Sequence, residues 1–124
     1  MADRTLFDVK SVGRAYAEIS GSFATNNGAA LNSDYTYGDG FSVAFTSTGL
    51  YTITFEDTWP DLISATATLQ LATAAAQFAQ IGVYASSSKT LQIRVINAAG
   101  AVANTAANTN NRVNFHVVFA NSDA

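Results

Sequence analysis

Hydrophobic and polar residues alternate with a period of two along most of the chain. The runs 41–45 and 51–55 each carry an aromatic or branched apolar side chain at every second position. Alternation of this kind is typical of strands that bury one face. The polar linker 46–49 ends on Gly49, and glycine adopts positive φ easily, so the two runs predict a β-hairpin.

Five further stretches show the same pattern: 16–23, 63–71, 81–85, 91–95 and 113–119. Three consecutive serines separate the third stretch from the fourth, which predicts a second hairpin. In every stretch one face is apolar and is expected to point inward. The expected inward side chains are Ile63, Ala65, Ala67, Leu69, Leu71, Ile81, Val83, Ala85, Leu91, Ile93, Val95, Val113, Phe115, Val117 and Phe119.

The remaining stretches predict connections. Residues 26–39 and 97–111 are polar or small and indicate long loops, whereas 56–61 contains the only proline and indicates a corner. The stretch 72–80 has helical propensity but is short and lies between strand patterns, so no helix is expected there. Seven to eight short strands predict one all-β domain over 1–124, an antiparallel β-sandwich or barrel.

Composition supports a folded domain and excludes several classes of function. Charged residues make up only 12% of the chain, and there is no cysteine, but eight Phe, five Tyr and one Trp argue against disorder. The formal net charge is −3, and the six basic residues are scattered, so we expect no nucleic-acid partner.

No secretory signal is recognised at the start of the sequence, because the first residues lack an apolar core. The longest charge-free stretch, 62–88, contains too many Thr, Gln and Ser residues to cross a bilayer cheaply. We therefore expect a soluble protein that is made without an export signal and has no membrane partner.

Candidate chemistry is sparse. His116 is the only histidine, and with no cysteine or second histidine to join it, we expect it on an outer strand face or at a subunit contact. Asp34 and Asp39 flank a Tyr-rich loop that lacks the ligand pattern of an EF-hand, which leaves a bound loop cation as the less favoured alternative. No nucleotide-binding or hydrolase motif is present. We therefore expect no enzyme activity, no catalytic residue, no cofactor and no metal.

The acidic residues Glu56, Asp57 and Asp61 cluster around Trp59. Carboxylates beside an aromatic residue could belong to a glycosidase or to a sugar-binding platform. These three share one short turn, however, whereas glycosidase carboxylates face each other across a cleft. They are better interpreted as solvated acids of a turn.

Some predicted strands place large side chains on both faces. Val118 lies opposite the phenylalanines of its strand, and Leu50 and Tyr84 each adjoin another large apolar residue. A sandwich strand with one solvated face should alternate more cleanly, so these strands suggest subunit contacts. The residues expected at an oligomer interface are His116, Val118, Tyr84 and Leu50.

The N-terminal segment, 1–12, differs from the rest of the chain. It places Leu6 and Phe7 among charged residues and is followed by Gly13. Such a segment predicts an arm that either frays or attaches to a neighbour. A first edge strand of the same sandwich is an equally weighted alternative.

Several short runs resemble small structural proteins of tailed bacteriophages. The opening, FDVKSVGR followed by ISGSF, resembles the start of these proteins, and the later runs follow in the matching order. Each run has low specificity alone, so their order over most of the chain carries the resemblance. The runs are 7–14, 19–23, 40–43, 49–55, 59–65 and 111–115.

The resemblance implies a capsid decoration (cement) protein with a jelly-roll or related fold. Such a protein would be made in the host cytoplasm and would bind the major capsid protein on the outer surface of the head as a homotrimer. Leu6 and Phe7 would then contact the capsid or a neighbouring copy. The resemblance itself implies no binding residues; Leu6 and Phe7 are chosen from the character of the N-terminal segment.

The main alternative is a tail or tail-fibre component whose β-sandwich binds a receptor or glycan. Trp59, Tyr35 and Tyr37 would be its stacking surfaces. A small enzyme and a cellular lectin-like or adhesin domain are less favoured, the first for want of a site and the second for want of an export signal.

Overall fold

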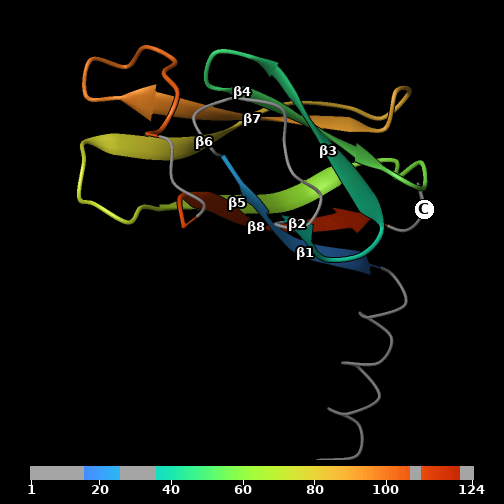
Figure 1. Cartoon of the computed structure of the whole chain (residues 1–124). Coiled ribbons are helices and arrows are strands. Elements are labelled where there is room, and N and C mark those ends of the chain that lie inside the picture. Colours follow the sequence, from blue (N-terminus) through green and yellow to red (C-terminus); the bar gives the residue numbers. More distant parts are fainter. Residues whose placement is uncertain (1–15, 26–35, 107–109, 121–124) are drawn as a thin grey trace, which may run out of the picture.

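The structure is a computed structural model that describes residues 16–25, 36–106 and 110–120. Eight strands form two antiparallel sheets that pack face to face as a sandwich (Figure 1). The described residues contain no helix, as the sequence predicts. The strands are β1 (Tyr16–Ala24), β2 (Thr36–Tyr37), β3 (Phe41–Ser47), β4 (Leu50–Phe55), β5 (Leu62–Gln70), β6 (Gln77–Ala85), β7 (Thr90–Asn97) and β8 (Arg112–Ala120).

Strand order does not follow chain order. Sheet A has the order β2-β1-β8-β5, and sheet B has the order β3-β4-β7-β6. The first long strand therefore pairs with the last, in register from Tyr16↔Ala120 to Ala24↔Arg112. Within sheet B, the β3–β4 and β6–β7 hairpins are the two predicted from the sequence. The other connections that follow β2 carry the chain between the sheets, so the two sheets interlock.

The core lies between the two sheets and is built from alternate residues of their strands. Burial of a large apolar side chain contributes about 1.5–3 kcal/mol, so this layer supplies most of the driving force for folding. Aromatic rings join the sheets: the Phe23 and Tyr51 ring centroids are 5.1 Å apart, and those of Phe55 and Phe119 are 4.8 Å apart. The buried apolar cluster comprises Phe23, Tyr51, Ile53, Phe55, Leu91, Ile93, Val95, Val113, Phe115, Val117 and Phe119.

Two strands depart from the alternation predicted for them, and each does so at a register shift. In β5 the shift lies between Leu62 and Ser64, and it leaves Ile63 exposed. In β6 it lies between Ile81 and Tyr84; Val83 points outward with 66% of its surface exposed. The predictions that Ile63 and Val83 point inward are therefore wrong. A bulge adds one residue to a strand and so inverts the faces of the residues beyond it.

The predicted corner connects β4 of sheet B to β5 of sheet A. Its tryptophan packs on the core, with the Trp59 and Phe119 rings stacked at 5.9 Å and 11° between their planes. The Tyr84 hydroxyl donates a 2.6 Å hydrogen bond to the Trp59 carbonyl. These contacts hold the corner against the sandwich and leave Trp59 only partly exposed.

The predicted loop 26–39 contains one short element that the sequence pattern does not reveal. Thr36 and Tyr37 form β2, which pairs with Phe23 and Ser22 at the edge of sheet A. Two residues are too few for a period-two pattern to be detected, so this strand depends on its partner. Tyr35, Asp34, Leu6 and Phe7 lie outside the described residues.

Candidate binding surfaces

Tyr37 lies on the outer face of sheet A within a row of side chains that crosses all four strands. Its register partner is Ser22 of β1, which pairs with Asn114 of β8, which in turn pairs with Thr68 of β5. Arg112 and Gln70 are paired in the adjacent row. Tyr37 is 55% exposed, a large fraction for an aromatic side chain on a sheet.

Hydrogen bonds and a cation–π contact organise this group. The Arg112 guanidinium carbon lies 5.1 Å from the centroid of the Tyr37 ring, within the range of a cation–π interaction. Arg112 Nη1 also donates a 3.1 Å hydrogen bond to Ser22 Oγ. Asn114 Nδ2 donates a 3.3 Å bond to Gln70 Oε1. We call this group, formed by Tyr37, Ser22, Arg112, Asn114 and Gln70, the Tyr37 platform.

The chain reaches this position through a tight turn between β2 and β3. Gly38 has φ +126°, and a Cβ there would lie 2.6 Å from both the Ser20 carbonyl oxygen and a ring carbon of Phe41. Only glycine fits such a backbone so close to its neighbours. The turn therefore places Tyr37 at the sheet edge before the chain crosses to sheet B.

The outer face of sheet B carries a second group, which is apolar. Phe78 of β6 pairs with Ile96 of β7, and Ile96 forms an isolated bridge with Val102. Phe78 is 57% exposed and Val102 is 42% exposed. We call Phe78, Ile96 and Val102 the β6–β7 patch. Val83 is exposed farther along the same edge strand.

The four residues predicted at an oligomer interface do not form one surface. His116 and Val118 lie on the outer face of sheet A, where they pair with Ser20 and Glu18 of β1. Leu50 shares the outer face of sheet B with Arg94. Tyr84 instead packs into the sandwich against Phe55 and Phe119. The interface itself stays a prediction.

Sequence reasoning missed Phe78 and Val102, and it placed Val83 on the wrong face. Phe78 falls in the stretch 72–80, where no strand was expected. Gly82 was the available signal for Val83, because a glycine within a strand often marks a bulge. Val102 could not be assigned, since its bridge to Ile96 joins two residues across a loop.

His116 lies beside a charged residue, Glu18. Its Nε2 lies 3.5 Å from Oε1 of Glu18, and the two side chains are 46% and 68% exposed. A contact so open to solvent is a surface ion pair, which stabilises proteins little. His116 therefore lies on an outer strand face, one of the two positions expected from the sequence.

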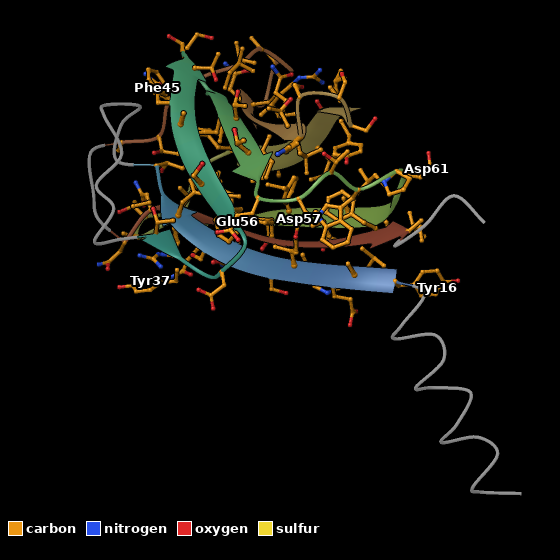
Figure 2. The ribbon with its side chains drawn as sticks, turned by 90° about the vertical axis from the view of Figure 1, so that its right-hand side faces the viewer. Tyr16, Tyr37, Phe45, Glu56, Asp57 and Asp61 are labelled. Carbon is orange, nitrogen blue, oxygen red and sulfur yellow. The ribbon has the colours of Figure 1, made fainter. Side chains whose placement is uncertain are left out.

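The acids near Trp59 are exposed, and Figure 2 shows Asp61 set apart from Glu56 and Asp57. They thus do not face each other across a cleft. Over 16–25, 36–106 and 110–120, no group of three or more His, Cys, Asp or Glu residues is placed to hold a metal ion. A small cavity at the β5–β6 connection is lined mainly by alanines and by Leu71, Gln77 and Asn111.

These two surfaces, the Tyr37 platform and the β6–β7 patch, are the candidate sites of the described chain. Within those same residues, no helix is long and apolar enough to cross a membrane. No protein-family model, no curated protein and no solved structure matches the chain.

Proposed function

We propose that the protein is a structural component of a tailed-bacteriophage particle, a decoration protein that binds the outer surface of the head and stabilises the shell. The observation that carries the proposal is the β6–β7 patch, an exposed apolar surface on a small domain of low charge. The resemblance of the sequence runs to phage structural proteins gives the proposal its biological setting. The fold supports the proposal at the level of a β-sandwich, because the β3–β4 and β6–β7 hairpins each stay within sheet B, whereas the corresponding strands of a jelly roll alternate between the two sheets.

The β6–β7 patch favours an oligomer, because burying its apolar side chains against a second copy would lower the free energy. Removing apolar surface from water is worth about 25 cal/mol per Å². Phe78 lies on β6, an edge strand of sheet B, whose outer backbone groups have no partner strand within the sheet. Edge strands that expose apolar residues are common contact surfaces between chains. We infer that a second copy of this protein covers the patch.

A cyclic trimer, the assembly expected from the sequence, needs two different contact patches on each copy. The β6–β7 patch lies on the outer face of sheet B, whereas His116 and Val118 lie on the outer face of sheet A. The two surfaces are therefore distinct, as a head-to-tail ring requires. In this proposal the β6–β7 patch of one copy contacts the His116–Val118 face of the next.

Attachment to the shell is assigned to the N-terminal segment, through Leu6 and Phe7. Three tethered segments would bind the major capsid protein at high effective concentration, so each contact need only be weak. Replacing Leu6 and Phe7 with Asp should leave the trimer intact and weaken attachment to capsids. Unchanged attachment in a capsid-binding assay would remove the segment from the mechanism.

The deciding experiment is the copy number of the protein in purified particles, measured by quantitative mass spectrometry against the major capsid protein. A copy number comparable with that of the capsid protein is expected. A handful of copies per particle would instead favour the tail or fibre alternative, and absence from particles would overturn the virion assignment.

The oligomer is tested separately by light scattering after size-exclusion chromatography. The double variant Phe78→Ser/Val102→Ser should dissociate the trimer. Tyr37→Ser is the matched control, because Tyr37 is also exposed, at 55%, but lies on β2 at the edge of sheet A, away from both assigned contacts. A monomeric native protein, or a double variant that remains trimeric, would contradict the assigned contact.

A further inference from the structure

We infer that the Tyr37 platform binds two neighbouring hexose units of a polysaccharide, one stacked on Tyr37 beside Arg112 and the next bonded to Asn114 and Gln70, which lie two and three strands from Tyr37. This activity is distinct from shell attachment and trimer formation, because it centres on the β2 end of sheet A rather than on the N-terminal segment, the β6–β7 patch or the His116–Val118 face.

The ring of Tyr37 is held in place before any ligand arrives. Arg112 lies over it at 5.1 Å and is itself anchored to Ser22 by a 3.1 Å hydrogen bond. Ser22 is the register partner of Tyr37, so the anchor and the ring move together. A ring fixed in this way loses little conformational entropy on binding, which favours affinity from a small contact. More than half of the side chain still faces solvent.

Polar groups continue across the sheet from the ring. Neighbouring strands are about 4.8 Å apart, so Asn114 and Gln70 lie roughly 10 and 14 Å from Tyr37, at the position of a second sugar unit beside the stacked one. The bond from Asn114 to Gln70 uses one amide hydrogen and one carbonyl oxygen. Each amide carries further donors and acceptors, and the Arg112 guanidinium carries five N–H groups in all. Sugar hydroxyl groups both donate and accept hydrogen bonds, so they can pair with this mixture of side-chain donors and acceptors.

The chemistry of the face favours a sugar over a protein or a nucleic acid. A protein hot spot needs a desolvated apolar centre, whereas the neighbours of Tyr37 here are Ser, Thr, Asn, Gln and Arg side chains. Nucleic-acid binding needs several cations to neutralise phosphates, and the platform supplies one. A pyranose has an apolar C–H face that stacks on an aromatic ring and a rim of hydroxyls, which matches the platform on both counts.

The test is a titration of the full-length, ¹⁵N-labelled protein, followed by NMR. The probes are the disaccharides maltose, cellobiose, lactose and diacetylchitobiose, because an open platform should bind a two-unit sugar with Kd of about 1–10 mM. At least one probe should shift the amide signals of residues 22, 37, 70, 112 and 114 together. No localised shift with any probe would overturn the inference.

Variants separate stacking from general surface effects. Tyr37→Ala should weaken binding about tenfold or more, and Tyr37→Phe should retain most of it. The matched control is Tyr16→Ala: Tyr16 is 41% exposed on the same outer face, at the opposite end of β1 (Figure 2). An equal loss of sugar binding in Tyr16→Ala and Tyr37→Ala, or no loss in Tyr37→Ala, would also overturn the inference. If Tyr37→Ala loses its dispersed NMR spectrum, Asn114→Ala serves as the second variant. It leaves Tyr37 intact and should still weaken sugar binding.

Discussion

A Cβ atom on Gly21 would lie 2.3 Å from Cζ of Phe41, so the glycine of β1 and the phenylalanine of β3 occupy complementary space between the two sheets. The same Cβ would lie 2.7 Å from Cζ of Phe115, the register partner of Gly21 in β8. The two phenyl rings meet edge to face with their centroids 5.0 Å apart. The absence of a side chain at Gly21 lets this aromatic pair bridge the sheets.

Gly21→Ala should therefore destabilise the fold. Both rings would have to move, and overpacking of this kind costs about 1–3 kcal/mol. Urea denaturation of the variant and the native protein measures the difference. Ser20→Ala is the control, since Ser20 is the exposed neighbour on the opposite face of β1 and its loss should change the free energy of unfolding by less than about 0.5 kcal/mol. Equal stability of Gly21→Ala and the native protein would contradict the packing described.

The alternation in the sequence predicts correctly those strands whose two faces differ in polarity along their whole length. In β8, Val113, Phe115, Val117 and Phe119 are all buried, as the alternation predicts. Ile63 and Val83 were misplaced because a bulge depends on how the partner strand is registered. A single sequence carries no direct information on that pairing, although Gly82 was a local sign of it.

The binding surfaces were less predictable than the fold. Tyr37 is visible in the sequence as an aromatic residue of a polar loop, but its contact with Arg112 is not. That contact requires β1 to pair with both β2 and β8, which brings together residues far apart in the chain. Trp59, another of the three candidate stacking residues, is packed on Phe119, because the corner folds onto the core.

A buried pair of hydroxyl groups gives a second prediction. Thr25 and Thr105 are 0% and 1% exposed, and their Oγ1 atoms are hydrogen-bonded to each other. Thr25→Val would leave the Thr105 hydroxyl without this partner, at a cost of about 1–3 kcal/mol. The Asn111 carbonyl, which Thr25 Oγ1 also contacts at 3.2 Å, keeps its bond from the Thr25 backbone N–H.

The double variant Thr25→Val/Thr105→Val isolates the interaction. Replacing both partners with apolar groups of the same shape removes the unsatisfied hydroxyl, so the double variant should be more stable than the sum of the single changes implies. Denaturant titrations of the four proteins give the coupling energy, and strictly additive losses would show that the pair contributes nothing.

The surface ion pair of Glu18 and His116 should contribute little to stability, in contrast to the buried pair of threonines. Because both side chains are largely exposed at 3.5 Å separation in the single chain, Glu18→Gln should alter thermal stability very little at neutral pH in the monomeric Phe78→Ser/Val102→Ser background. The matched variant His116→Gln should behave in the same way. A large loss of stability in either variant in that monomeric background would contradict the interpretation of the contact as a surface ion pair.

The buried phenol of Tyr51 predicts a loss of stability at high pH. Desolvation by burial raises the pKa of Tyr51 from 10.0 to about 12, and its hydroxyl donates a 3.3 Å hydrogen bond to the Thr25 carbonyl. Between these two pKa values the unfolded chain has released the proton while the folded chain keeps it. The free energy of unfolding should therefore be unaffected below pH 10 and should fall by up to about 2.7 kcal/mol as the pH rises toward 12.

Tyr51→Phe isolates this effect from the titration of other groups, because it removes only the phenol oxygen of a side chain that is 0% exposed. The variant should lose about 0.5–1.5 kcal/mol near neutral pH through the missing hydrogen bond. Above pH 10 its stability should fall less steeply than that of the native protein, so the two urea-denaturation curves should converge. Parallel pH profiles for the two proteins would mean that Tyr51 ionises as readily in the folded chain as in the unfolded one, and that the interior of the sandwich at this position is open to water.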